Sequence, residues 1–122
     1  MAVSIPIFTS QLEKSREAVD AANLRDAYAQ IITAILTEEV DLSANNTSKI
    51  TYTNGTAATG GAAYVPPTAT IEATQQVAKW ATAPDIGGKV LGENDGGPGS
   101  WTISVNAESG EPTITYLAVF IL

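Results

Sequence analysis

The feature that most constrains the fold is the stretch from Ile7 to Leu42, which contains no glycine or proline. Such a stretch can form one continuous helix, because no residue in it breaks the backbone hydrogen-bond pattern. In its second half, apolar residues recur at intervals of three and four, as on one face of a helix: Leu24, Tyr28, Ile31 and Ile35. We therefore predict one long helix over residues 1–42.

The predicted helix is too long for the domain that carries it. A stretch of this length would extend ~54 Å as a helix, whereas a compact chain of 122 residues has a diameter of about 35 Å. We therefore expect the N-terminal end to overhang the domain by several turns. Apolar residues also form a stripe in this half of the helix: Ile5, Phe8, Leu12 and Val19. An overhanging apolar end needs a partner, which we expect to be a membrane, another subunit or both.

The C-terminal part of the chain has the clearest strand pattern. Between Ser100 and Val105, the residues Trp101, Ile103 and Val105 alternate with small polar residues, which predicts a strand with one buried face. A loop containing Gly110 should then turn the chain back into a second strand over residues 113–122.

Further strands are predicted upstream. The β-branched segments 49–53 and 68–76 favour strands, and 89–91 favours a short one. Residues 77–82 could continue the second of these strands or form a helical turn around Trp80. A helix followed by strands is typical of the α+β class, so we predict a long helix packed on an antiparallel sheet of three or four strands.

By length the chain is a single domain over residues 1–122. Its parts are the helix at 1–42, a connecting loop region at 43–67 and the sheet at 68–122. The connecting region begins with turn-forming residues, Ser43-Ala-Asn-Asn-Thr-Ser48, and ends at Pro66-Pro67.

Composition excludes several function classes. Six Lys and Arg stand against 13 Asp and Glu, which gives a net charge of −7 and argues against direct nucleic-acid binding. The chain has no His and no Cys, so the commonest catalytic bases, metal ligands and thiol nucleophiles are missing. We expect a non-enzymatic protein without a cofactor.

A weak calcium motif occurs in the Gly-rich loop from Gly92 to Gly99. Glu93, Asn94 and Asp95 offer the oxygen ligands that Ca²⁺ prefers, but their spacing matches no EF-hand. A polar turn built from Gly, Asn and Asp is the favoured interpretation.

The N-terminal segment combines several features in a fixed order. An apolar run contains Pro6, the aromatic Phe8 follows, then a charged cluster at residues 13–17 and the segment Asn23-Leu24-Arg25. This order resembles the type IV pilins and pseudopilins, most closely the pilin-like proteins of Gram-positive bacteria. The resemblance covers residues 2–36 well. The remainder is similar in outline, as helix, variable loop, antiparallel sheet and Trp-containing C-terminal hairpin.

The resemblance implies a location and an anchor. In that family a short leader and about twenty apolar residues precede the equivalent of Pro6 and hold the protein in a membrane. This chain therefore looks like a pilin without its membrane half-helix. The protein is expected in the cytoplasmic or inner membrane before assembly and on the cell surface afterwards. A C-terminal Cys pair, present in many Gram-negative pilins, is missing here.

The resemblance further implies a structural subunit of a pilus or secretion pseudopilus, with copies of itself and other pilins as partners. The filament interface is expected at Ile5, Pro6, Ile7, Phe8, Leu12 and Arg16. The core between helix and sheet is expected at Leu24, Tyr28, Ile31, Ile35, Trp101 and Ile103. Exposed ion pairs contribute little, so the charges at Glu13, Lys14, Arg16 and Glu17 are interpreted mainly as a solvated face. The alternative function is an adhesin-like module that binds through the 56–67 loop or an exposed Trp.

Overall fold

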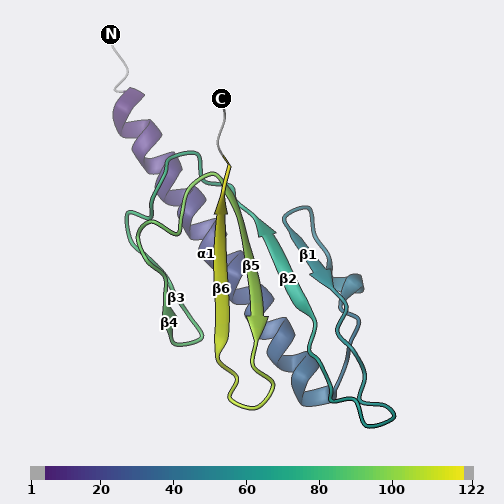
Figure 1. Cartoon of the computed structure of the whole chain (residues 1–122). Helices are drawn as coiled ribbons and strands as arrows, with labels where there is room; N and C mark the ends of the chain where they lie inside the picture. Colours follow the sequence, from purple (N-terminus) through teal and green to yellow (C-terminus); the bar gives the residue numbers. More distant parts are fainter. Residues whose placement is uncertain (1–4, 120–122) are drawn as a thin grey trace.

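The structure is a computed structural model that describes the backbone of residues 5–119 and the side chains of residues 10–119. One long helix lies across one face of a four-stranded antiparallel sheet (Figure 1), which confirms the predicted α+β class. The elements, in chain order, are α1 (Ile5–Thr37), the 3₁₀ turn η1 (Ser43–Asn45), β1 (Ile50–Thr53), β2 (Thr68–Glu72), β3 (Asp85–Ile86), β4 (Lys89–Val90), β5 (Gly99–Val105) and β6 (Pro112–Ala118).

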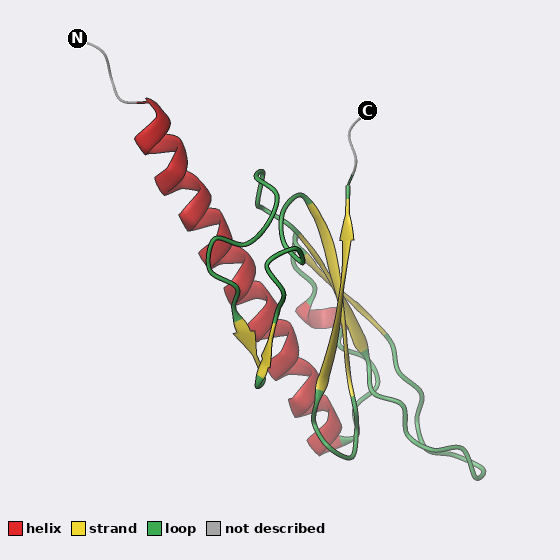
Figure 2. Ribbon diagram, turned by 60° about the vertical axis from the view of Figure 1, so that its left-hand side comes forward, coloured by secondary structure: helices red, strands yellow, loops and turns green. Residues whose placement is uncertain are grey.

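The strand order in the main sheet is β1-β2-β5-β6, and each neighbouring pair is antiparallel. Strands β3 and β4 form a separate two-stranded hairpin that lies beside the helix (Figure 2). The strand predicted at residues 49–53 therefore joins the sheet, although it belongs to the region that the sequence assigned to connecting loop.

The helix ends at Thr37, so the predicted end at Leu42 was wrong. Glu38 takes a left-handed conformation with φ 56°, and the Glu39 N–H donates to the Ala34 carbonyl at 2.9 Å, a pattern that closes helices. The hydroxyl of Tyr64 donates to the Glu39 carbonyl at 2.6 Å. After this stop Leu42 turns into the core and is 4% exposed.

Two strands are shorter than predicted. Strand β2 ends at Glu72 rather than at residue 76, and β6 ends at Ala118. Residues 77–82 form neither a strand nor a helical turn. From Thr74 to Val77 the backbone N–H groups donate to side chains of α1, so they are not available to continue the β2 ladder.

The core lies between α1 and the inner face of the sheet. Leu24, Ile31, Trp101 and Ile103, all expected there, are fully buried. The other two expected core residues, Tyr28 and Ile35, are partly buried and pack against the same cluster. The Tyr28 hydroxyl donates to the Gly110 carbonyl at 2.7 Å, so the helix also holds the β5–β6 turn.

The outer face of the sheet carries rows of hydroxyl side chains. One row crosses all four strands through directly paired positions: Thr51, Thr70, Thr102 and Thr115. Cross-strand Thr pairs stabilise a sheet, and their small polar side chains suit a face that no other element covers.

Candidate functional site

Three carboxylates follow one face of α1 in its N-terminal half: Glu13, Glu17 and Asp20. Their spacing of i, i+4 and i+7 continues the face that buries Leu24 and Ile31. Glu13 is 8% exposed and Asp20 is fully buried. The interpretation of Glu13 and Glu17 as part of a solvated face was therefore wrong, and the buried role of Asp20 was missed.

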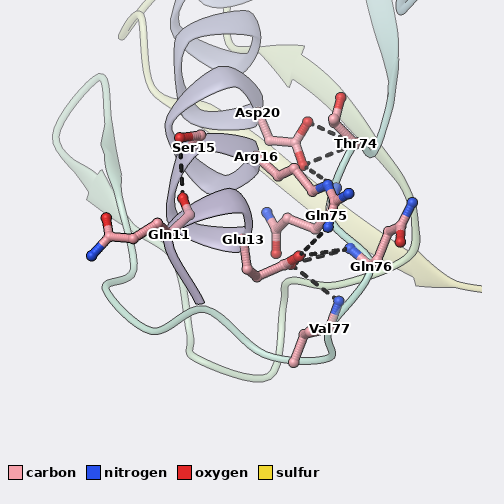
Figure 3. A network of polar contacts seen from close by, with 9 residues as sticks. All are labelled: Gln11, Glu13, Ser15, Arg16, Asp20, Thr74, Gln75, Gln76 and Val77. Atoms are coloured by element: carbon pink, nitrogen blue, oxygen red, sulfur yellow. Dashed lines mark hydrogen bonds and ion pairs between the residues drawn. The ribbon is translucent and has the colours of Figure 1, made fainter. Parts of the chain in front are cut away.

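The carboxylates bind the backbone of residues 74–82 (Figure 3). One oxygen of Asp20 accepts from the Thr74 N–H at 2.8 Å, and the other accepts from the Gln75 N–H at 3.0 Å. The Glu13 carboxylate accepts from the N–H groups of Gln76 and Val77, both at 3.1 Å. Hydrogen bonds to ionised acceptors are among the stronger ones in proteins.

Glu17 completes the set by accepting from the Ala81 N–H at 3.1 Å and the Thr82 N–H at 3.4 Å. We call Glu13, Glu17 and Asp20 together the carboxylate clamp. The clamp thus binds backbone N–H groups at both ends of residues 74–82, a segment that has no strand partner. Its sequence signal was available, because three acidic residues continue the apolar face of the helix. The backbone N–H groups that the clamp binds lie 54 to 65 positions along the chain. No sequence pattern in residues 74–82 indicates that they bind these carboxylates.

Gln75 is buried under the clamp. Its side chain is 2% exposed and points toward α1 between Glu13 and Asp20 (Figure 3). Neither its amide oxygen nor its amide nitrogen has a hydrogen-bond partner among the described residues. Residues 74–82 are therefore held by the clamp and by the bonds that the Lys79 and Trp80 N–H groups donate to the carbonyls of Gly96 and Glu93, and not by this amide.

Beyond the clamp, α1 leaves the body of the protein. Residues 5–12 extend past the sheet (Figures 1 and 2), about two turns rather than the several that the sequence predicted. Of the expected filament-interface residues, Leu12 is 39% exposed. Arg16 is half-buried and bonds Glu13 at 3.4 Å. The side chains of the other four lie outside the described part of the structure: Ile5, Pro6, Ile7 and Phe8.

An exposed apolar strip accompanies the overhang. Val19 is 47% exposed and lies two turns after Leu12, on the same helix face. The clamp occupies a different face, so the body does not cover this strip. The strip formed by Leu12 and Val19 is the part of the predicted N-terminal stripe that the structure describes.

The loop 92–99 is organised by indoles. The Asp95 carbonyl accepts from Trp80 Nε1 at 2.8 Å and from Trp101 Nε1 at 2.7 Å. The calcium candidates Glu93, Asn94 and Asp95 are exposed, and within residues 5–119 no three acidic, His or Cys groups are close enough to hold a metal ion. The loop is thus a polar turn folded around two Trp side chains.

Both Trp residues are unavailable to a ligand. Trp80 is 4% exposed and Trp101 is fully buried, and their ring centroids lie 5.5 Å apart. Neither Trp side chain is therefore exposed enough for a sugar to stack on it, as an adhesin of that kind would require. The 56–65 loop, in contrast, extends away from the sheet (Figure 1), and most of its side chains are exposed.

Tyr52 places an unpaired hydroxyl in the core. The residue is buried on β1, and its hydroxyl has no hydrogen-bond partner in the described part of the chain. Burial, followed by the nearby charge of Asp26, raises the pKa of Tyr52 to about 12. The folded state therefore holds the phenol proton over a pH range in which the unfolded chain loses it.

We expect Tyr52→Phe to leave the free energy of unfolding unchanged or to raise it by up to about 1 kcal/mol near neutral pH, because an unpaired buried hydroxyl is removed. Above about pH 10 the wild type should lose stability until about pH 12, since only its unfolded state releases the Tyr52 proton there. Urea denaturation at neutral and alkaline pH tests both points. A Tyr52→Phe variant with the same alkaline loss as the wild type would contradict the assignment.

No helix within residues 5–119 is both long and apolar enough to cross a bilayer. Comparison of the chain with protein-family models, with curated proteins and with solved structures found no match.

Proposed function

We propose that this protein is a structural subunit of a filament of the type IV pilus or pseudopilus class and that it assembles through the overhanging end of α1. The observation that carries this proposal is the extension of residues 5–12 beyond the sheet (Figure 2). The sequence of the extension is rich in apolar residues, among them Ile5, Ile7, Phe8 and Leu12. A helix end of this composition gains stability by packing against other helices.

The exposed strip on the helix supports an open array. Leu12 and Val19 lie on a face that the subunit leaves uncovered. If neighbouring copies pack their helices side by side in one direction, each copy uses two different surfaces, and the array grows as a helical filament rather than closing into a ring. Apolar contact along the strip is then the main source of assembly energy.

The carboxylate clamp fits the same role. Glu13 and Asp20 attach the N-terminal half of α1 to residues 74–82 by hydrogen bonds instead of apolar contacts. The apolar side chains of Leu12 and Val19 are exposed and would be available to neighbouring subunits. Glu13 also attaches α1 to the body at the turn from which the overhang begins. This attachment keeps the overhang in a fixed direction.

The similarity of residues 2–36 to pilins extends this proposal to location and partners. The protein would be held in the cytoplasmic or inner membrane before assembly, through an apolar segment preceding Pro6, and exposed on the cell surface in the filament. Its partners would be copies of itself and other pilins. A net charge of −7 argues against direct contact with nucleic acid, and the proposed role needs no catalytic site.

Immunoelectron microscopy of surface filaments tests the proposal. Filaments sheared from cells that express the native gene should carry gold label from an antibody against this protein along their length. Label confined to the cell body, with filaments unlabelled, would refute a role as filament subunit. Label on a non-filamentous surface layer would instead favour the adhesin-like alternative.

A pair of matched variants tests the interface. We expect Leu12→Glu to remove the protein from filaments, because a charge in the packed strip would have to be buried without a partner. Leu36→Glu is the control, since Leu36 lies at the other end of α1 and is 80% exposed. Quantitative blotting of sheared fractions should show a loss of at least about tenfold for the first variant only. Equal amounts of both variants in filaments would exclude Leu12 from the interface.

A further inference from the structure

The two edges of the main sheet are treated differently. At the β1 edge, the Ile50 carbonyl accepts from the Thr47 N–H at 2.9 Å, and the Ile50 N–H donates to the Thr47 hydroxyl at 3.0 Å. The Tyr52 N–H donates to Asn46 Oδ1 at 2.8 Å. The turn before β1 therefore satisfies three of the four outward backbone groups of Ile50 and Tyr52 and covers most of this edge.

The β6 edge is open. At its two ends the β5–β6 ladder bonds Val119 N–H to the Pro98 carbonyl and Asn106 N–H to the Glu111 carbonyl. Because the bonding side alternates in an antiparallel pair, the N–H and C=O groups of Ile114, Tyr116 and Ala118 point away from β5. No hydrogen bond joins these groups to another residue within the described range.

The open strand carries one feature that hinders edge pairing, Pro112 at its first position, and none in the rest of its length. Edge strands are usually protected by charged side chains, proline or bulges. From Thr113 to the C-terminus the sequence has no charged residue and no proline, and the β6 register is continuous over seven paired positions. Leu117 is 70% exposed and Val119 is 57% exposed, so apolar surface borders the open edge.

We propose that β6 pairs antiparallel with β6 of a second copy of this chain and joins the two sheets into one. A charged partner peptide would find no opposite charge on this strand. Two copies, each with a net charge of −7, meet here without placing like charges opposite one another. The contact has two-fold symmetry and is closed, so it is distinct from the open helix contact proposed above and does not rest on it.

Two matched lysine variants test the edge by sedimentation equilibrium on the purified chain. Thr115 and Thr51 are both exposed threonines on the outer face of an edge strand, so either position tolerates a long side chain. Thr115→Lys brings like charges together across the two-fold axis and should weaken the dimer at least about tenfold. Thr51→Lys should leave it unchanged. A wild type that stays monomeric up to about 1 mM, or equal weakening by both variants, would overturn the proposal.

Spin labels give a second test that does not depend on a change in affinity. The chain has no Cys, so Thr115→Cys and Thr51→Cys each create a single labelling site. In the proposed order β1-β2-β5-β6-β6-β5-β2-β1, labels on β6 lie roughly 10–20 Å apart, whereas labels on β1 are seven strand spacings, or roughly 34 Å, apart. Equal distances at both sites, or the shorter distance at Thr51, would refute β6 pairing.

Discussion

Replacing Trp101 with alanine should lower the free energy of unfolding by about 4 kcal/mol, the largest loss expected from any single substitution in the core. The indole is fully buried and lies between the rings of Trp80 and Tyr116, with ring centroids 5.5 Å away on each side. Its N–H also donates to the Asp95 carbonyl. Truncation therefore leaves a cavity, breaks two aromatic contacts and loosens the 92–99 loop.

Urea denaturation followed by circular dichroism measures this loss, with Thr102→Ala as the control. Thr102 is the next residue on β5 but faces outward and is exposed, so its truncation should cost only about 1 kcal/mol, from the loss of its cross-strand pairs with Thr70 and Thr115. Trp101→Phe should fall between the two, because it retains a buried aromatic ring but loses part of the indole volume and the N–H bond to Asp95. A Trp101→Ala variant as stable as Thr102→Ala would mean that the aromatic cluster does not anchor the sheet.

Asp20→Ala should be the second most damaging change, with an expected loss of about 3 kcal/mol. The variant removes a fully buried carboxylate and leaves the Thr74 and Gln75 N–H groups without acceptors, each of which costs about 1–3 kcal/mol when buried. Residues 74–82 should detach at one end. Lys79 lies in this segment and is exposed, so trypsin should cleave after it much faster than in the wild type.

Asp26→Ala is the matched control, because Asp26 is an exposed carboxylate on the same helix. It should change neither the unfolding midpoint nor the rate of cleavage at Lys79. Asp20→Asn keeps one acceptor oxygen and should lie between the two variants. If Asp20→Ala and Asp26→Ala cleave at the same rate, the segment is held by its other contacts and the clamp is not what fixes it.

The parts of this fold that could be predicted are those with local causes. The face of α1 with Leu24 and Ile31 follows from helical spacing, and strand β5 follows from the alternation that buries Trp101 and Ile103. The turn between β5 and β6 has its own signal in Gly110. Each of these features depends on residues close together in the chain.

The errors in the prediction have non-local causes. The helix stops at Thr37 in a stretch without glycine or proline, because Glu38 adopts a left-handed conformation and Tyr64, from the connecting loop, binds the Glu39 carbonyl. The N–H of Ala73 still donates to the Gly99 carbonyl, and the ladder of β2 stops beyond it because Asp20 accepts from the N–H groups of Thr74 and Gln75. No spacing within either element shows that a residue far along the chain will intervene.

The candidate interface was predictable in kind but not in extent. An apolar stripe through Leu12 and Val19 was expected, and both side chains are exposed. Within the described residues the overhang is shorter than expected, because the expectation compared the length of a helix reaching Leu42 with the diameter of a compact domain and did not foresee that residues 13–20 are attached to the body. Acidic residues on the core-facing side of a helix were the available signal that residues 13–20 already belong to the body of the protein.

The carboxylate clamp also sets an order of folding. Its bonds join positions 54 to 65 residues apart, and residues 74–82 have no strand partner of their own. Non-local contacts form only after the intervening chain has been closed, so we expect this segment to become ordered after α1 has docked on the sheet. Segments held in this way are also the first to open. The turns from which α1 leaves the body are therefore supported by a segment that we expect to fold late.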